Sequence, residues 1–229
     1  MARPTADERL EQMVVAATAM FSERGFVNAR MSDIADRAGV SQGLLYNYFE
    51  SKDALLRYVV ERIVAGTPVT VTELPMATPE PGATIRILGR ALRDGFAGEA
   101  LDVAVRHRNP DDAPDELRRI LTEFYDSVSR WRDLLRIVER SAHDLPALGQ
   151  SHFGEGRRRF IDRLGEYLQV RIDDGLFRPV PDPTVAARLL IETIAWSANH
   201  RLGDPHSADI DDAVAKETVL SMLCAAVLL

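Results

Sequence analysis

The segment from Met31 to Lys52, MSDIADRAGVSQGLLYNYFESK, carries residues whose types and spacing suit contact with nucleic acid. Ala35 is small where two short helices would cross, and Gly39 can adopt the positive φ that a tight turn requires. Val40 and Leu45 would then close a small core between the two helices. This arrangement predicts a helix-turn-helix.

The second of these helices would present its exposed side chains to the major groove of DNA. Ser41 is its candidate N-cap, because a serine hydroxyl can accept a hydrogen bond from a backbone N–H of the first turn. Amide, hydroxyl and apolar groups either read base edges or position a helix on the phosphates. The residues that would enter the groove are Gln42, Gly43, Leu44, Tyr46 and Asn47.

Apolar residues that recur at steps of three and four predict helices along most of the chain. Thr5 and Glu8 form a candidate capping box, Gly25 would end the first helix, and Ser51 would cap the helix after the turn motif. The prolines of residues 67–82 are too dense for a helix and indicate a long connector, for which no partner strand is evident. Outside the turn motif, the predicted helices span about residues 6–24, 52–65, 85–96, 101–105, 117–138, 160–172, 184–202 and 209–228.

Composition places the chain among ordinary globular proteins, since 46% of its 229 residues are hydrophobic and 28% are charged. The formal net charge of −7 argues against a protein that coats nucleic acid or membranes without specificity. Cys224 is the single cysteine, which excludes an internal disulfide and a multi-cysteine zinc site. No signal peptide is evident, and the charge-free tail from Thr218 to Leu229 is too short to span a bilayer. We therefore expect a cytoplasmic protein without a membrane segment.

The stretch from Gly25 to Leu55, GF-x4-MSDIADRAGVSQGLLYNYFESKDAL, resembles the TetR family of bacterial transcriptional regulators. The loop GLFRPVPDP from Gly175 to Pro183 is similar to a turn found in many members. The resemblance implies an all-α fold in which an N-terminal three-helix, helix-turn-helix DNA-binding head precedes a helical effector-binding and dimerisation body. It implies a head over residues 1–50, a linking helix over 51–66 and a body over 67–229.

Three positions depart from the family pattern. Arg30 stands where a capping threonine is usual, so it cannot cap the helix but can still contact phosphate. Leu44 would offer an apolar face to a thymine methyl group, and the amide of Asn47 suits adenine. The operator sequence therefore cannot be carried over from a relative. With these departures, the residues expected to contact DNA are Arg30, Ser41, Gln42, Gly43, Leu44, Tyr46, Asn47, Tyr48 and Lys52.

The head lacks the net positive charge that is usual for a DNA-binding domain, because residues 1–62 hold eight basic and nine acidic residues, a balance of 8 − 9 = −1. Binding to DNA would then depend on where the few basic residues lie, with Arg3, Arg30 and Lys52 directed at phosphate. Tyr46 and Tyr48 can donate hydrogen bonds to phosphate without charge. For Tyr48 the alternative is packing in the core.

The body offers aromatic residues that could line an effector pocket, although plain core packing is the alternative for each. They are Phe96, Phe124, Tyr125 and Trp131, with Phe160 as a further member. The histidines lack the spacing of a metal site, and no catalytic motif or cofactor loop occurs, so we expect neither an enzyme nor a metal or cofactor.

The leading interpretation is a homodimeric transcriptional repressor that binds a palindromic operator and is released from it by a small-molecule effector. Helices near 184–202 and 209–228 are apolar over so much of their surface that they are expected to pair with a second copy. The effector would act through the helix at 52–65, whose far end the connector would leave free to move. The rivals are an activator of the same fold and a helical ligand-binding or catalytic protein whose head does not bind DNA.

Overall fold

The computed structural model describes residues 5–96, 98–106, 113–142 and 155–229, and these residues form helices without a β-strand. The predicted all-α class is confirmed. The chain divides into two compact units. Unit 1 comprises residues 1–93 and 133–154, and unit 2 comprises residues 94–132 and 155–229.

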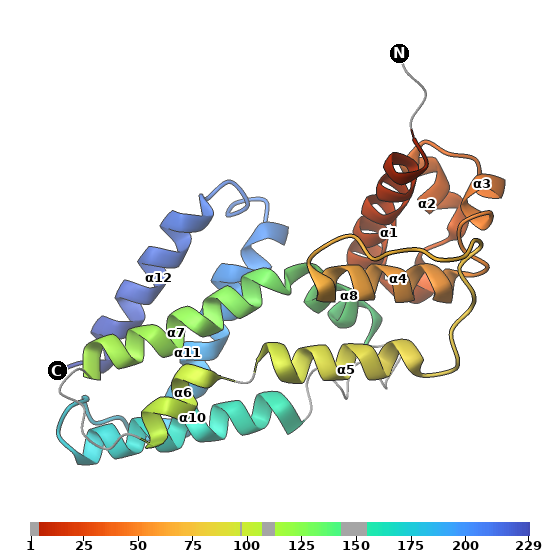
Figure 1. Ribbon diagram of the computed structural model, residues 1–229. Coiled ribbons are helices and arrows are strands. Elements are labelled where there is room, and N and C mark those ends of the chain that lie inside the picture. The colour runs from red at the N-terminus through yellow and green to blue at the C-terminus, as the bar shows by residue number, and fades with distance from the viewer. Residues whose placement is uncertain (1–4, 97, 107–112, 143–154) are drawn as a thin grey trace. The chain divides into compact units, whose positions relative to one another are not determined.

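Unit 1 begins with three helices that form the predicted helix-turn-helix head, α1 (Ala6–Asn28), α2 (Met31–Ala38) and α3 (Gln42–Tyr46) (Figure 1). Gly39 has the expected left-handed conformation with φ of 68°, and the Val40 N–H donates to the Ala35 carbonyl at 3.0 Å. Ile34 and Leu45 are fully buried between the helices. Burial of these side chains sets the position of α3, which is too short to be stable alone.

Gly25 bends α1 but does not end it, because its φ of 76° interrupts the helix and a last turn follows to Asn28. The bend lies against the end of α8 (Arg132–Ser141), where a Cβ on Gly25 would be 2.7 Å from the Arg140 carbonyl oxygen. The adjacent Phe26 N–H donates to the buried Ser141 hydroxyl at 2.9 Å. Only glycine combines this φ with so close an approach.

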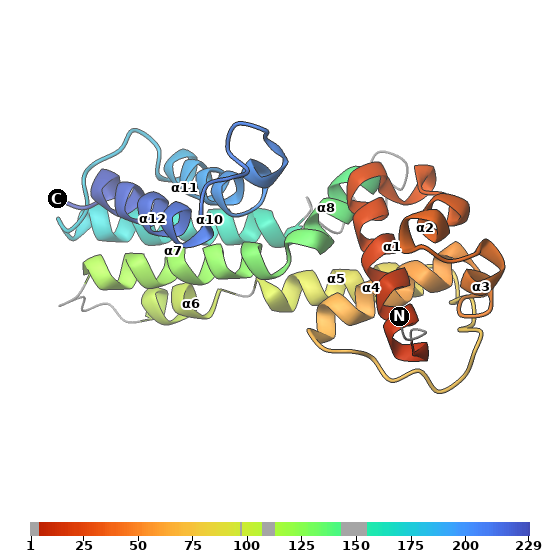
Figure 2. The ribbon, with the colours of Figure 1, turned by 90° about the horizontal axis from the view of Figure 1, so that it is seen from above.

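Helix α4 (Lys52–Ala65) follows α3, is capped by Ser51 as predicted, and stops at left-handed Gly66. The connector over residues 67–82 then leads to α5 (Ala83–Gly95). The connector forms no strand, as expected, but it is bonded to other parts of unit 1, which the sequence did not indicate. Met76 forms an isolated parallel bridge with Phe49, and the Tyr58 hydroxyl donates to the Val69 carbonyl at 3.0 Å. Figures 1 and 2 show the connector returning beside α4 to the loop after α3.

Unit 2 is a helical bundle whose elements are α6 (Glu99–Arg106), α7 (Ala113–Arg130), α10 (Glu155–Asp173), α11 (Pro183–Ala198), a 3₁₀ turn (His200–Gly203) and α12 (Asp212–Val227). The single helix predicted over 117–138 is instead two helices, α7 and α8, which are separated by a turn at Trp131. The indole of Trp131 packs so closely on Gly95 that a Cβ there would lie 2.6 Å from the ring nitrogen. Apolar spacing continues through this turn, so periodicity alone could not detect it.

A buried arginine connects α11 to the start of α12. Arg201 is fully buried, and its guanidinium donates to the carbonyls of Ser197 and Ile210, each at 2.7 Å. It also pairs with Asp212, which in turn accepts from Arg132 at 3.3 Å. Because a buried guanidinium needs its donors satisfied, these bonds determine the path of the α11–α12 loop.

Candidate functional site

The outward face of α3 exposes the side chains that were predicted to enter a DNA groove. Gln42, Gly43 and Asn47 are exposed, the Tyr46 side chain is 43% exposed, and Leu44 is half-buried. Leu45, on the opposite face, is fully buried and attaches the helix to the head. The structure thus brings these five predicted residues to one exposed surface, which we call the recognition face.

Gly43 has no packing role within the chain. A Cβ built on it would meet no atom within 4 Å, and its φ is not in the left-handed region. Glycine inside a helix costs roughly 0.5–1 kcal/mol relative to alanine, so intramolecular stability does not favour it. Open space in front of the backbone at this point suits the close approach of a large partner.

Ser41 and Tyr48 contribute to the local structure. The Ser41 hydroxyl accepts from the Leu44 N–H at 3.1 Å, which confirms it as the N-cap of α3. Tyr48 is 7% exposed, and its hydroxyl donates to the Ala6 carbonyl at 3.4 Å. The ring therefore lies in the core, as in the alternative interpretation, and a phosphate contact by Tyr48 stays a prediction that this burial disfavours.

Lys52 lies at the end of α1. Its ammonium group donates to the carbonyl oxygens of Val27 at 3.1 Å and Ala29 at 2.9 Å, and lies 4.6 Å from the centre of the Phe26 ring. Partial burial lowers the pKa of Lys52, an effect that the nearby Asp53 opposes. An ammonium has three donors, so one remains for a phosphate oxygen. The phosphate contact stays a prediction, and the structure adds a second role that the sequence did not indicate.

Ion pairs use several of the acidic groups in the head. Arg24 pairs with Asp33 and Arg37 with Glu23, both at 2.7 Å. Arg30 is exposed, caps nothing with its side chain, and forms no ion pair within the described part of the chain. Its contact with phosphate stays a prediction, and Arg3 lies outside the described residues.

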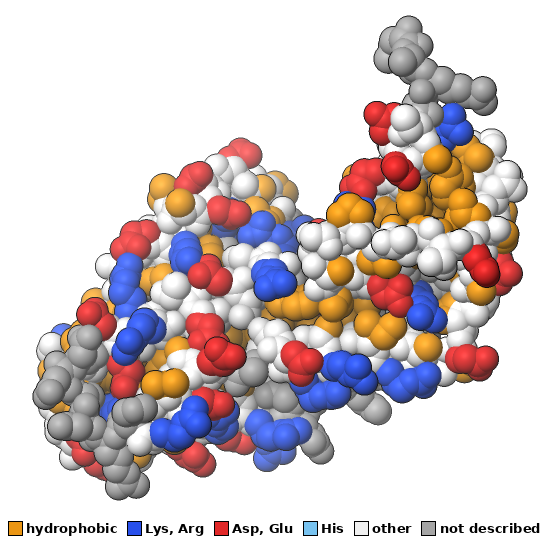
Figure 3. All heavy atoms as spheres, viewed as in Figure 1, with side chains coloured by type: hydrophobic (Ala, Val, Ile, Leu, Met, Phe, Trp, Pro, Cys, Tyr) orange, Lys and Arg blue, Asp and Glu red, His pale blue; other side chains and the backbone are white. Residues whose placement is uncertain are grey.

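Further positive charge in unit 1 comes from α5. Figure 3 shows basic side chains gathered along this helix, and its exposed arginines are Arg86, Arg90 and Arg93. No acidic residue lies between Ala83 and Arg93, so this stretch carries a charge of +3. This basic stretch lies in the same unit as the helix-turn-helix head.

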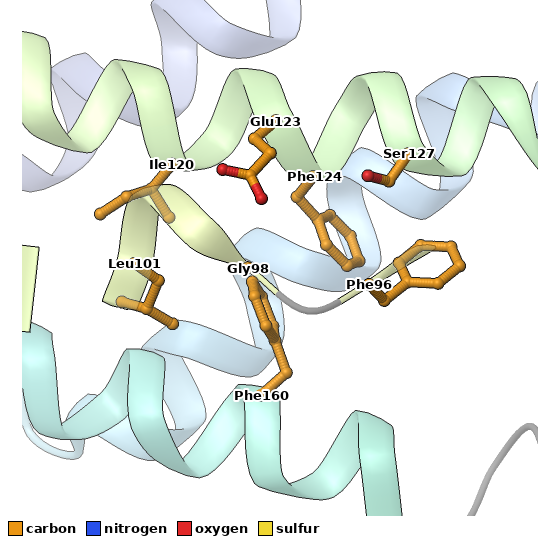
Figure 4. Close-up of a pocket in the computed structure, with 8 residues that line it drawn as sticks. All are labelled: Phe96, Gly98, Leu101, Ile120, Glu123, Phe124, Ser127 and Phe160. Atoms are coloured by element: carbon orange, nitrogen blue, oxygen red, sulfur yellow. The ribbon is translucent and has the colours of Figure 1, made fainter. Parts of the chain in front are cut away.

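A small pocket lies in unit 2 between α6, α7 and α10 (Figure 4). Phe124 forms its centre, with ring centroids 5.8 Å from Phe96 and 5.2 Å from Phe160. Leu101, Ile120, Ser127 and Gly98 complete the wall with Glu123. The enclosed volume is about 10 Å³, roughly the room that one water molecule needs.

Two features of the pocket wall were not predicted. The Glu123 carboxylate accepts the N–H groups of Glu99 at 2.8 Å and Ala100 at 2.7 Å, and so caps α6 from α7. A Cβ on Gly98 would lie 2.6 Å from the Phe160 ring, and its φ is +76°. Both contacts join residues distant in sequence, so residue type alone carried no signal for them.

The structure brings together only some of the aromatic residues predicted for a pocket. Phe96, Phe124 and Phe160 line it, whereas Tyr125 and Trp131 are not among the lining residues. Tyr125 is 2% exposed and lies near the ammonium of Lys216, and Trp131 is 6% exposed against Gly95. Both side chains are therefore packed in the core, which was the alternative to lining a pocket.

Large apolar side chains are exposed along one side of α11 and α12. Leu189 on α11 is 63% exposed and Met222 on α12 is 67% exposed, while Ile194 and Leu220 on the same helices are buried. The alternative in which both helices are buried within one subunit is therefore wrong for the described residues. The further exposed members of this apolar face are Val185, Trp196 and Val214.

Other site types find little support in the described residues. Among them, no cluster of three or more histidine, cysteine, aspartate or glutamate side chains has the arrangement of a metal site. In the same part of the chain, no helix has the length and apolar character needed to cross a membrane.

Comparisons with known proteins agree with this architecture. Residues 14–59 match the family model of bacterial regulatory proteins of the tetR family, and residues 115–225 match the C-terminal domain of AefR-like transcriptional repressors. The chain is 25% identical to the HTH-type transcriptional repressor KstR2 of Rhodococcus jostii (strain RHA1) over 225 residues, which cover 95% of this chain and 93% of that repressor.

Two further comparisons cover the head and the fold. Over 58 residues the chain is 48% identical to the HTH-type transcriptional activator FasR of Mycolicibacterium smegmatis, a match that spans 25% of this chain and 26% of the activator. The structure of KstR2 from Mycobacterium tuberculosis aligns with a TM-score of 0.54 and 18% identity over 98% of this chain and 97% of that one. With the exposed recognition face on α3 and family models that match residues 14–59 and 115–225, this chain belongs to the TetR family of bacterial transcriptional regulators.

Proposed function

We propose that the protein is a transcriptional repressor that binds a palindromic operator as a homodimer and releases it when a small molecule enters unit 2. The observation that carries this proposal is the recognition face of α3, whose polar and aromatic side chains are exposed on a helix attached to the head by Leu45. Side chains presented in this way fit the major groove, where base edges are distinguishable.

Each residue of the interface has a proposed role. Gln42 and Asn47 read base edges through their amides, and Leu44 contacts a thymine methyl group. Tyr46 and Arg30 position the head on phosphate, with one N–H of the Lys52 ammonium in support. The functional division of the chain into a head (1–50), a linking helix (51–66) and a body (67–229) is part of the same proposal.

A homodimer is proposed because α11 and α12 expose the apolar face that contains Leu189 and Met222. Pairing these two helices with those of a second copy would form a four-helix bundle and remove this surface from water. A two-fold symmetric dimer carries two recognition faces, which explains why the proposed operator is an inverted repeat. Each half-site would then contact one head.

The effector is proposed to bind at the cluster of Phe96, Phe124 and Phe160. Ligand pockets usually enclose about 300–1,000 Å³, so a volume of about 10 Å³ leaves no room for an organic molecule without movement of the rings. Binding must therefore move α6, α7 or α10. That requirement suits a regulator, because a ligand shifts an equilibrium only when it prefers one conformation.

The chain itself offers routes by which such a movement reaches the head. Phe96 of the pocket directly follows α5, which belongs to unit 1 up to Arg93. The connector in turn joins the start of α5 to the end of α4. We propose that α4 changes its position on effector binding, so that the separation of the two heads no longer matches the half-sites.

Selection of DNA from a random pool tests this proposal. The purified full-length protein at low salt is expected to enrich an inverted repeat with half-sites in adjacent major grooves. Enrichment of no sequence would contradict the proposal and favour a ligand-binding protein whose head does not contact DNA. A reporter gene driven by a promoter that contains the selected site then distinguishes repression from activation by the sign of its response.

No catalytic role is part of the proposal, because the residues of the recognition face and of the pocket suit binding. The proposed place of action is the cytoplasm, where the chromosomal DNA of a bacterium is found. The proposal includes no metal ion or cofactor.

A further inference from the structure

The connector makes a dense set of hydrogen bonds to the loop that ends the recognition helix. The Met76 N–H donates to the Tyr48 carbonyl at 2.7 Å, and the Glu50 N–H donates to the Met76 carbonyl at 3.0 Å. The Thr78 N–H donates to the Glu50 carboxylate and its hydroxyl to the Ser51 hydroxyl, both at 2.8 Å. Residues 76–78 thus form a strap across residues 48–51.

The strap contributes little to the core. Thr78 and the residues on either side of Met76 are exposed, and Met76 itself is only half-buried. By the burial of apolar surface, such a segment adds little to the free energy of folding. Its four hydrogen bonds are therefore better explained by the loop at residues 48–51 that they hold in place than by any burial of apolar surface.

The position of α3 needs such support. The helix has five residues, Gln42 to Tyr46, and a helix of this length has no stability of its own. At its N-terminal end, the turn at Gly39 and the buried side chain of Leu45 set its place. At its C-terminal end, the chain leaves α3 through Asn47 and enters the loop that the strap contacts.

We propose that Met76 and Thr78 are positioning residues for DNA recognition, which act by holding the C-terminal end of α3 in the orientation that binds the major groove. This inference rests on the proposed binding of operator DNA. A recognition helix that is already held in its bound orientation loses less conformational entropy on binding. The entropic cost of binding is then smaller and the affinity for DNA is higher. The strap therefore raises operator affinity without touching DNA.

Two variants weaken the strap at different bonds. Met76→Pro removes the N–H that donates to Tyr48, and Thr78→Val removes the hydroxyl that donates to Ser51 with little change of shape. Tyr58→Phe is the matched control, because it removes the hydrogen bond that the Tyr58 hydroxyl of α4 donates to the Val69 carbonyl of the connector and leaves residues 76–78 in place. All three are made in the full-length chain.

The first measurement is affinity for the inverted-repeat duplex that the unmodified protein selects. Met76→Pro is expected to weaken binding about tenfold and Thr78→Val by a smaller factor, as the loss of one or two hydrogen bonds implies. The salt dependence of binding should stay the same, since no phosphate contact is lost. Tyr58→Phe should bind as the unmodified protein does, and melting temperatures should fall by less than about 4 °C.

The second measurement is hydrogen exchange without DNA. Faster exchange is expected at the amides of Asn47, Tyr48 and Phe49 in Met76→Pro and Thr78→Val but not in Tyr58→Phe. All three amides donate to backbone carbonyls of α3, so they report on how firmly its C-terminal end is held. Unchanged affinity in Met76→Pro would overturn the inference, and so would an equal loss in all three variants. If the unmodified protein selects no DNA, the proposed function fails, whereas unchanged exchange in Met76→Pro would refute the strap itself.

Discussion

The ammonium group of Lys52, at the start of α4, lies 2.9 Å from the carbonyl oxygen of Ala29, just beyond the end of α1. A second hydrogen bond, to the Val27 carbonyl, places the positive charge beside the C-terminal end of α1. A cation is favourable there because the helix dipole is negative at this end. The same side chain thus joins two helices of the head and lies in the segment predicted to contact phosphate. The two roles have different experimental signatures.

Lys52→Ala is expected to weaken binding to all DNA sequences alike and to reduce the salt slope of binding by about one, because one phosphate contact is lost. The melting temperature should fall as well, since the α1 carbonyls lose their donor. Lys216→Ala, which removes a lysine of the body that pairs with Asp126, is the control and should leave DNA binding unchanged. A lower melting temperature with an unchanged salt slope would show that Lys52 is purely structural.

Gly43→Ala should have opposite effects on stability and on binding. Alanine has open space at this position and favours the helix by roughly 0.5–1 kcal/mol, so the melting temperature should rise slightly. A methyl group at the recognition face should weaken operator binding about tenfold, which corresponds to about 1.4 kcal/mol. Gly203→Ala, also made into open space but in the body, should leave operator affinity as it was. Full affinity in Gly43→Ala would mean that DNA does not approach this part of α3.

Met222→Glu and Leu189→Glu should convert the dimer into a folded monomer. Both side chains are more than 60% exposed in the single chain, so a charge there harms only an apolar interface with another subunit. Multi-angle light scattering at micromolar concentration measures the mass, and circular dichroism checks the helical content. As the control, Val105→Glu on α6 places the same charge at an exposed apolar residue outside this face, and this variant should remain dimeric. A monomeric unmodified protein would contradict the proposed assembly.

Phe124→Ala should abolish the response to an effector while keeping the fold. The ring contacts both other phenylalanines of the pocket and is half-buried, so its loss should cost less than the roughly 3–5 kcal/mol of a fully buried phenylalanine. A compound that raises the melting temperature of the unmodified protein is titrated into both proteins. Tyr125→Phe, which alters a neighbouring residue outside the pocket wall, should keep the response.

The same compound also tests the coupling between ligand and DNA. Thermodynamic linkage requires that operator DNA weaken ligand binding by the factor by which ligand weakens operator binding, commonly about 5–150-fold. Calorimetric titrations with and without the selected duplex measure this factor. Equal ligand affinity in both titrations would exclude that compound as an inducer.

Stability of the head should depend on pH through Glu23. The hydrogen bond from Arg37 lowers the pKa of Glu23 below its usual value of 4.5, an effect that burial partly opposes. A lowered pKa in the folded state means that the pair stabilises the fold above pH 4.5 and that this contribution is lost as the pH falls through the lowered pKa. Glu23→Gln should therefore unfold at a lower urea concentration than the unmodified protein at pH 7. Its free energy of unfolding should be lower by less than about 1 kcal/mol, because the pair is exposed. The difference should shrink towards pH 3, and a difference independent of pH would contradict the assignment.

The sequence by itself determined the helix-turn-helix and the serine caps of its second helix and of the helix that follows. Local rules suffice there, because the Ser41 and Ser51 caps, the left-handed Gly39 and the buried Leu45 each act within a few residues. The recognition face could be predicted for the same reason, since neighbours in a short helix determine which side chains remain exposed. Family resemblance added the expectation of a dimeric, ligand-responsive body.

Contacts between residues distant in sequence were decided only by the tertiary structure. The bonds of Lys52 to α1, of Met76 to Tyr48 and of Glu123 to the start of α6 join positions more than 20 residues apart, and no periodicity encodes such pairs. The break at Trp131 is of the same kind, because the apolar pattern continues through it while the indole packs against Gly95. Short-range patterns determine which segments become helices, whereas the packing of those helices decides which polar groups meet.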